Sequence, residues 1–130
     1  MMYSAPARFG AARSYRNVDL TSRVEGATPH ALVGILFEEL LKSLDAMIVA
    51  MRRGDFTQRA SRQGRSLSIL HGLEASLDHE RGADIARDLA LIYREARRRI
   101  MDGSRNNDMA QVEKAREMLN EIATAWERIS

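Results

Sequence analysis

The 130-residue sequence contains no cysteine, and aromatic residues make up only 5% of it. The absence of cysteine excludes disulfide bonds and thiolate metal ligands, and it fits a reducing compartment. Three phenylalanines, three tyrosines and one tryptophan do not supply the aromatic platform on which proteins stack single-stranded bases. These absences argue against a disulfide scaffold, a thiolate metal site and a single-strand-binding surface.

Long apolar runs are also missing. No segment approaches the ~20 apolar residues of a membrane span, and no apolar stretch follows residues 1–6. We therefore expect no signal peptide, no direct insertion into a membrane and a cytoplasmic location. Hydrophobic residues make up 45% and charged residues 29%, which is typical of one soluble globular domain.

The net charge of +2 is concentrated in the leading segment. Residues 1–27 carry four arginines against Asp19 and Glu25, which gives +2, so residues 28–130 sum to zero. A protein that tracks nucleic acid needs a clustered positive footprint on its folded face. We therefore expect no nucleic-acid partner, although a helical regulator that binds nucleic acid through its basic arm is an alternative.

Two zones are visible along the chain. Residues 1–27 lack sustained periodicity and are typical of a flexible arm. From Thr28 onward, apolar residues recur at three- and four-residue steps, which predicts helices over about 29–52, 56–77, 84–101 and 109–129. Thr28 and Asp55 are suited to cap two of these helices, and Gly54 to end the first.

Two signals concern the later helices. Gly103 is expected to break the third helix after Met101, and Asp108 with Gln111 suggests a capping box at the start of the fourth. The expected core stripes include Leu40, Leu44 and Met47, then Phe56, Ala60, Leu70 and Leu73, then Ile85, Leu89, Ile92 and Ile100, and finally Val112, Leu119, Ile122, Trp126 and Ile129.

Four helices of similar length, joined by short loops and without a strand signal, predict an all-α fold. The simplest arrangement is an antiparallel up-down-up-down four-helix bundle over residues 28–130, preceded by a mobile N-terminal arm.

No group of residues indicates an enzyme. His30, His71 and His79 do not form the His-x-x-x-His or Glu-x-x-His spacing that places two ligands on one helix face. The glycines are scattered singly, and no nucleophile elbow occurs. We expect no catalytic residue, no metal ligand and no cofactor.

Several large apolar residues fall outside the core stripes on a helical wheel. Ile35 and Leu91 point nearly opposite their stripes, whereas Leu41, Ile69 and Met118 lie on the shoulders. Such residues on different helices favour either grooves for an amphipathic segment of another protein or a homodimer interface. The pattern alone does not decide between these two interpretations.

Short motifs in a fixed order resemble the flagellar export chaperones of the FliS family. Sequences of that family typically contain, in this order, a tyrosine, a short polar stretch, Ser/Thr-Pro-x-x-Leu and Leu-Tyr-Asp-Gly. The matching residues are Tyr15, Val18-Asp19-Leu20-Thr21, Ala27-Thr28-Pro29-His30-Ala31-Leu32-Val33 and Leu36-Phe37-Glu38-Glu39, followed by Gly82-Ala83-Asp84-Ile85-Ala86, Ile92-Tyr93, Val112, Leu119 and Ala125-Trp126.

The sequence departs from this pattern at Phe37, where tyrosine is usual, and at Glu38-Glu39, which replaces Asp/Asn-Gly. The resemblance implies a cytoplasmic type III export chaperone that binds the disordered C-terminal segment of flagellin. It would prevent premature polymerisation and aid delivery to the flagellar export apparatus. Export-gate and flagellar assembly factors are further expected partners, and a structural homodimer is the alternative.

The resemblance also gives the arm a role, because the family's N-terminal arm covers part of the client site. We hypothesise that arm residues fill a groove until the client displaces them. The candidate partner-binding residues are Tyr15, Val18, Leu20, Ile35, Leu41, Ile69, Leu91, Tyr93, Met118 and Ile122.

Overall fold

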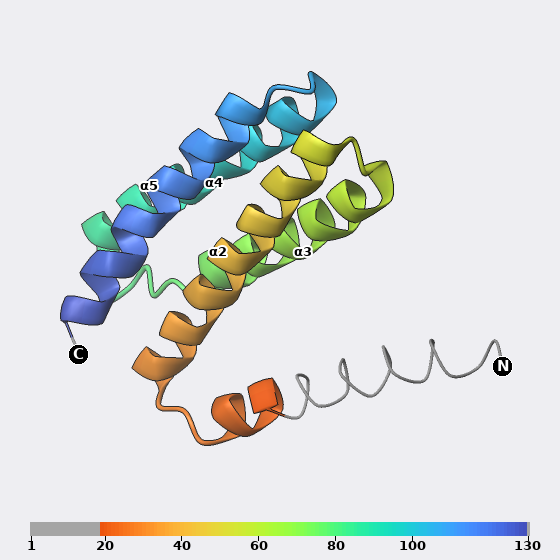
Figure 1. Cartoon of the computed structure of the whole chain (residues 1–130). Helices are drawn as coiled ribbons and strands as arrows, with labels where there is room; N and C mark the ends of the chain where they lie inside the picture. Colours follow the sequence, from red (N-terminus) through yellow and green to blue (C-terminus); the bar gives the residue numbers. More distant parts are fainter. Residues whose placement is uncertain (1–18, 130) are drawn as a thin grey trace, which may run out of the picture. The chain divides into compact units, whose positions relative to one another are not determined.

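The computed structural model of the chain describes residues 19–129, which contain helices and no strand (Figure 1). The long helices are α2 (Pro29–Arg53), α3 (Phe56–Ala75), α4 (Ala83–Arg105) and α5 (Met109–Arg128). The chain divides between Leu32 and Val33 into two units. In the first unit, residues 19–25 are helical, within the segment for which the sequence showed no periodicity.

The start and end signals around the first loop are confirmed. The Thr28 hydroxyl accepts a hydrogen bond from the Ala31 N–H at 3.1 Å, and the Asp55 carboxylate accepts one from the Gln58 N–H at 3.1 Å. Gly54 has a φ of 67°, a left-handed conformation that glycine adopts without steric cost. These local contacts explain why the bounds of α2 and the start of α3 agree with the sequence prediction.

The predicted break at Gly103 and the predicted capping box at Asp108 are wrong, although Asp108 directly precedes α5 as expected. Helix α4 runs past Met101 to Arg105, and Gly103 is buried inside it. A Cβ atom at Gly103 would lie 2.9 Å from both the Asp108 carbonyl oxygen and the Val112 Cγ2 atom. Glycine therefore occupies this position because the start of α5 approaches the α4 backbone, not because the helix ends. The Asp108 side chain makes no cap hydrogen bond.

Polar contacts join each helix to the next one around the bundle. Figure 1 shows the long helices side by side, with each helix antiparallel to the next one in the chain. The up-down-up-down helical bundle is therefore confirmed. The joining contacts are Glu39–Arg65 between α2 and α3, Glu74–Arg94 between α3 and α4, Gln111–Arg99 between α5 and α4, and Asp45–Arg116 between α2 and α5.

The core is formed by aliphatic side chains and one aromatic pair. The rings of Phe37 on α2 and Tyr93 on α4 lie with centroids 6.4 Å apart. Helix α4 contributes mainly small residues to the core. Among the described helices, α4 and α5 form the pair whose backbones lie closest together. The largest fully buried apolar side chains are Phe37, Leu40, Leu44, Met47, Leu73, Ile100, Val112 and Leu119.

Four residues expected in the core are exposed: Phe56, Ala60, Ile85 and Ile129. Phe56, Ile85 and Ile129 lie at the ends of their helices, where a stripe continues but the neighbouring helix no longer covers it. Ala60 lies in the first half of α3, where no residue before Ser66 is buried.

A buried pair of serines joins α2 to α3. The Ser66 hydroxyl donates to the Ser43 hydroxyl, which donates in turn to the Arg62 carbonyl oxygen, both at 3.0 Å. Both serines are at most 2% exposed. Because each hydroxyl has a partner, this polar pair is compatible with a buried position.

Tyr93 gives the fold a dependence on alkaline pH. Burial raises the pKa of its phenol to about 12, from an ordinary value of 10.0. The unfolded chain therefore loses this proton at lower pH than the folded chain, so stability falls as pH rises through this interval. We expect the contribution to be complete below pH 10 and to decrease by about 2–3 kcal/mol as pH approaches 12.

Urea unfolding at a series of pH values between 9 and 12 measures this dependence. The Tyr93→Phe variant should lack this component, because phenylalanine carries no titrating group at the same position. An identical alkaline slope in Tyr93→Phe and in the unchanged chain would contradict the prediction.

Candidate partner-binding surface

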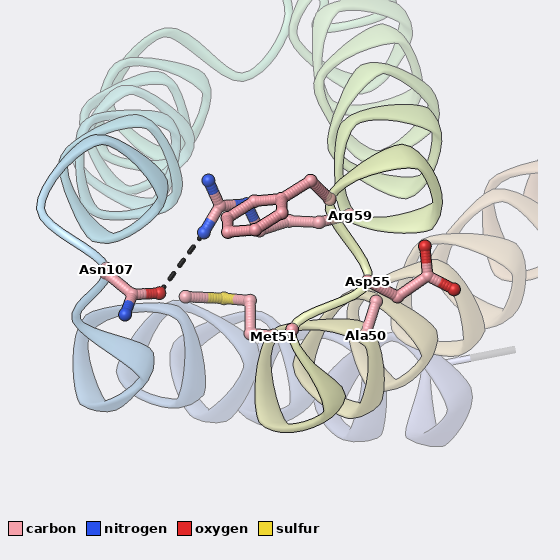
Figure 2. Close-up of a pocket in the computed structure, with 7 residues that line it drawn as sticks. Ala50, Met51, Asp55, Arg59 and Asn107 are labelled. Atoms are coloured by element: carbon pink, nitrogen blue, oxygen red, sulfur yellow. Dashed lines mark hydrogen bonds between the residues drawn. The ribbon is translucent and has the colours of Figure 1, made fainter.

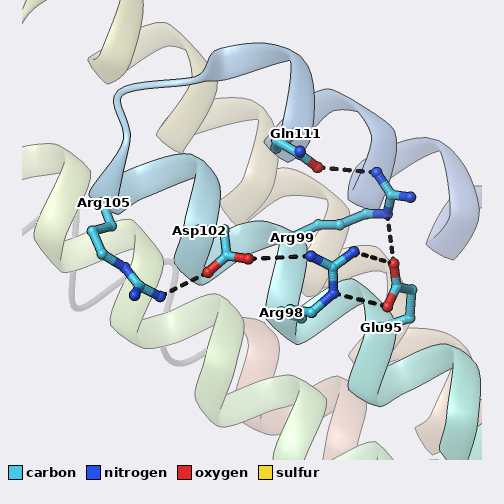
Figure 3. A network of polar contacts seen from close by, with 6 residues as sticks. All are labelled: Glu95, Arg98, Arg99, Asp102, Arg105 and Gln111. Atoms are coloured by element: carbon cyan, nitrogen blue, oxygen red, sulfur yellow. Dashed lines mark hydrogen bonds and ion pairs between the residues drawn. The ribbon is translucent and has the colours of Figure 1, made fainter.

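The interface between α4 and α5 has a polar end and an apolar end. At the polar end, near the turn that joins the two helices, the Arg99 guanidinium donates to Gln111 at 3.0 Å and to Glu95 at 3.1 Å (Figure 3). Arg98 binds Glu95 and Asp102 along the outer face of α4. The Arg98 hydrogen bond, together with the charges of Arg98 and Arg99, holds the pKa of Glu95 below its ordinary value.

The other end of this interface is apolar and exposed. Ile85 is 70% exposed and Ile129 is 65% exposed. Gly103 faces α5, and Ile85 precedes it by 18 residues, which is five full helical turns. Gln111 faces α4, and Ile129 follows it by the same number of turns. Ile85 therefore lies on the side of α4 that faces α5, and Ile129, the residue that directly follows α5, lies at the same end of the bundle.

Half-buried apolar residues continue the interface from these isoleucines toward the polar network. Their helical positions place them on the sides of α4 and α5 that face each other. We call this set the α4–α5 strip: Ile85, Leu89, Ile92, Met118, Ile122 and Ile129. Exposed apolar residues such as Ile85 and Ile129, beside further half-buried apolar ones, are typical of a protein-binding site.

Part of the predicted partner-binding set lies at or near this strip. Met118 and Ile122 belong to it, and both are half-buried. Leu91 is 57% exposed and directly precedes Ile92, on the outer face of α4. Tyr15 and Val18 lie outside the described residues. Leu20 is half-buried in the helical segment 19–25.

Two predicted residues are not at the surface. Tyr93 is 4% exposed because it lies three residues from both Ala90 and Ala96, on the side of α4 that faces the core. Ile35 was expected to point away from the core and is nevertheless only 8% exposed. It does not belong to the core cluster, so other residues cover it.

Leu41 and Ile69 are half-buried against the core on other sides of the bundle. Leu41 precedes Asp45, the α2 residue that binds α5, by one turn. Ile69 follows Arg65, the α3 residue that binds α2, by one turn. The structure therefore does not bring all predicted residues into a single surface.

Sequence reasoning missed Ile85 and Ile129 as surface residues because both fit the core stripes of their helices. A signal was available in their positions. In an antiparallel pair, the start of α4 and the end of α5 lie at the same end of the bundle, so stripe residues in these last turns have no further turn above them.

The cavity at the other end of the bundle is small. It measures about 60 Å³ and is lined by residues of α2, α3 and the turns beside them. The Arg59 guanidinium lies 4.9 Å from the centroid of the Phe56 ring and donates to the Asn107 side-chain oxygen at 3.2 Å (Figure 2). This volume accommodates a few water molecules and no organic cofactor.

The described residues also indicate neither a metal centre nor a membrane helix. Within residues 19–129, no group of three or more His, Cys, Asp and Glu side chains is placed to hold a metal ion. In the same part of the chain, every helix is too short or too polar to cross a membrane. The α4–α5 strip is the candidate functional surface because its apolar residues Ile85 and Ile129 are exposed.

Comparison with known proteins gives consistent matches over nearly the whole chain. A family model described as flagellar protein FliS matches residues 11–130. The flagellar secretion chaperone FliS of Salmonella typhimurium is 31% identical over 119 residues, which cover 91% of this chain and 88% of that protein. The flagellar secretion chaperone FliS of Vibrio cholerae is 29% identical over 120 residues, or 92% of this chain and 88% of that protein.

The flagellar secretion chaperone FliSB of Pseudomonas aeruginosa is 28% identical over 120 residues, which cover 92% of this chain and 95% of that protein.

Proposed function

This chain belongs to the FliS family of flagellar proteins, and from that premise we propose that it is a cytoplasmic export chaperone for flagellin. In this proposal it binds the disordered C-terminal segment of flagellin, prevents premature polymerisation and aids delivery to the flagellar export apparatus. Delivery implies a further contact with export-gate or assembly factors. The relatives' shared description as secretion chaperones supports a role in binding and not in catalysis.

The exposed end of the α4–α5 strip carries the proposal. A disordered client loses conformational entropy when it orders on a surface, so its site must offer enough apolar area to offset that cost. Burying an isoleucine side chain completely contributes about 1.5–3 kcal/mol. Ile85 and Ile129 are more than half exposed and therefore offer most of this contribution to a client.

The remaining predicted residues take different roles in this proposal. Met118, Ile122 and Leu91 contact the client directly, since they lie in the strip or beside it. Leu41 and Ile69 contact parts of the client that extend onto other sides of the bundle. The buried Ile35 and Tyr93 support the surface from within.

Titration calorimetry with a peptide of the last ~40 flagellin residues tests both the function and the proposed arm. We expect a 1:1 complex with the full chain. If Tyr15, Val18 and Leu20 occupy the client surface in the free protein, a chain that lacks residues 1–20 should bind about fivefold or more tightly, because less of it is in a closed state.

Two outcomes would count against these proposals. The absence of any complex with the cognate flagellin peptide, together with a dimer that persists with or without it, would favour a structural homodimer. Unchanged or weaker binding by the truncated chain would show that the arm does not compete with the client.

A further inference from the structure

The folded bundle is electrically asymmetric, although the charges of residues 28–130 sum to zero. Helix α3 carries three arginines against one glutamate, a net +2, and α4 carries six arginines against four acidic residues, also +2. Helix α2 carries three cations against three carboxylates, and α5 carries three cations against four, a net −1. The neighbouring helices α3 and α4 therefore hold +4, and the compensating negative charge lies elsewhere.

The two basic helices share one outer face. The Arg94 guanidinium of α4 binds the Glu74 carboxylate of α3 at 3.4 Å. Leu67 precedes Glu74 by two turns, and Met101 follows Arg94 by two turns. Because α3 and α4 are antiparallel, Leu67 and Met101 lie opposite each other, two turns from the ion pair and on the same side of it.

Arg97 lies on this face between the ion pair and the apolar residues. It follows Arg94 by three residues and precedes Met101 by four, so all three side chains project from one side of α4. Arg97 is exposed, and within residues 19–129 it forms no ion pair. By contrast, Figure 3 shows that Arg98 and Arg105 are bound to Glu95 and Asp102.

The apolar part of the face is accessible as well. Met101 is 44% exposed, and Leu67 is half-buried against the core. Methionine and leucine beside an unneutralised guanidinium favour a ligand that presents both apolar groups and carboxylates. An amphipathic helix with acidic residues three or four positions from its apolar ones has that chemistry.

We propose that the α3–α4 face, formed by Leu67, Glu74, Arg94, Arg97 and Met101, docks an acidic amphipathic helical segment of a partner protein. The apolar side of that segment lies on Leu67 and Met101, and its carboxylates bind Arg97 and the exposed edge of Arg94. A nucleic acid suits the face less well, because a phosphate backbone offers no apolar group to Met101 and Leu67.

The test uses a fluorescent synthetic peptide of about five helical turns, with leucines on one face and glutamates on the other. Its binding to the full chain is measured by fluorescence anisotropy. The Arg97→Glu variant should weaken binding about fivefold or more, because an attractive charge becomes repulsive. Met101→Ser should also weaken it, since an apolar contact is removed. Amide NMR shifts on peptide addition should cluster on α3 and α4.

The matched control is Lys114→Glu, which makes the same charge change on α5, where the Lys114 side chain is 52% exposed. We expect its affinity to stay within about twofold of the unchanged chain, because the substitution lies outside the face. Far-UV circular dichroism establishes that all variants are folded.

Three results would overturn the proposal. Equal losses of peptide affinity in Arg97→Glu and Lys114→Glu would show that the peptide responds to the net charge of the protein and not to this face. Equal binding of a peptide with lysines in place of the glutamates would remove the role of the arginines. Stronger binding of a DNA duplex, also sensitive to Arg97→Glu, would assign the face to nucleic acid. These assays contain no flagellin, so their results are independent of the proposed chaperone function.

Discussion

Replacing Gly103 by alanine is expected to lower the free energy of unfolding by about 1–3 kcal/mol, even though alanine is the better helix former. In a helix interior, alanine is favoured over glycine by up to about 1 kcal/mol. At Gly103 this gain is opposed by a Cβ atom 2.9 Å from the Asp108 carbonyl oxygen and 2.9 Å from the Val112 side chain. A backbone oxygen cannot turn aside as a flexible side chain does, so the helices must shift, and overpacking costs of this kind exceed the propensity gain.

The control is the same substitution at Gly64 in α3. A Cβ atom there would meet nothing within 4 Å. The stability should therefore change only through the higher helix propensity of alanine and the smaller conformational freedom of the unfolded chain. Gly64→Ala should raise the free energy of unfolding by about 0.5–1 kcal/mol. Urea unfolding followed by circular dichroism measures both variants. If Gly103→Ala stabilises the chain as much as Gly64→Ala does, α5 does not approach the α4 backbone at Gly103 as closely as described.

The second large effect concerns client binding. The double variant Ile85→Ser, Ile129→Ser should reduce affinity for the flagellin C-terminal peptide by about 100-fold. If both isoleucines become buried under the client, their removal costs about 3 kcal/mol or more, and about 1.4 kcal/mol corresponds to each factor of ten. Their present exposure means that the free protein should change in stability by only about 0.5 kcal/mol per site.

Val49→Ser provides the matched control. Val49 is a β-branched residue on α2 that is 39% exposed and does not belong to the α4–α5 strip, and its substitution should leave affinity within about twofold. Titration calorimetry with the same peptide measures the affinity of both variants. Comparable affinity losses in the control and in the double variant would remove the strip from the client site while leaving the family assignment untouched.

The sequence predicted those parts of the fold that depend on neighbouring residues. Thr28, Asp55 and Gly54 act on the backbone within four positions of themselves, and each behaves as expected. Gly103 was misread because its role depends on Val112 and Asp108 across a turn. A glycine that ends a helix and a glycine that admits a second helix look identical in one sequence.

The candidate site shows the same limit. Periodicity states which side of a helix is apolar, but it does not state where the neighbouring helix ends, and this is why Ile85 and Ile129 were assigned to the core. Likewise, a charge sum of zero over residues 28–130 concealed the excess on α3 and α4, since a sum carries no positions. Met118 and Ile122 are half-buried, and periodicity gives only their place around one helix, so their role in binding a partner stays a prediction.

The hydrogen-bonded serines between α2 and α3 have a consequence for how the bundle assembles. Apolar stripes repeat every turn, so a shift of α3 along α2 by one turn would still oppose leucines to leucines. Such a shift would separate Ser66 from Ser43 and bury hydroxyls without partners, at a cost of about 1–3 kcal/mol for each. The two serines therefore favour a single alignment of α3 along α2 between two otherwise interchangeable apolar surfaces.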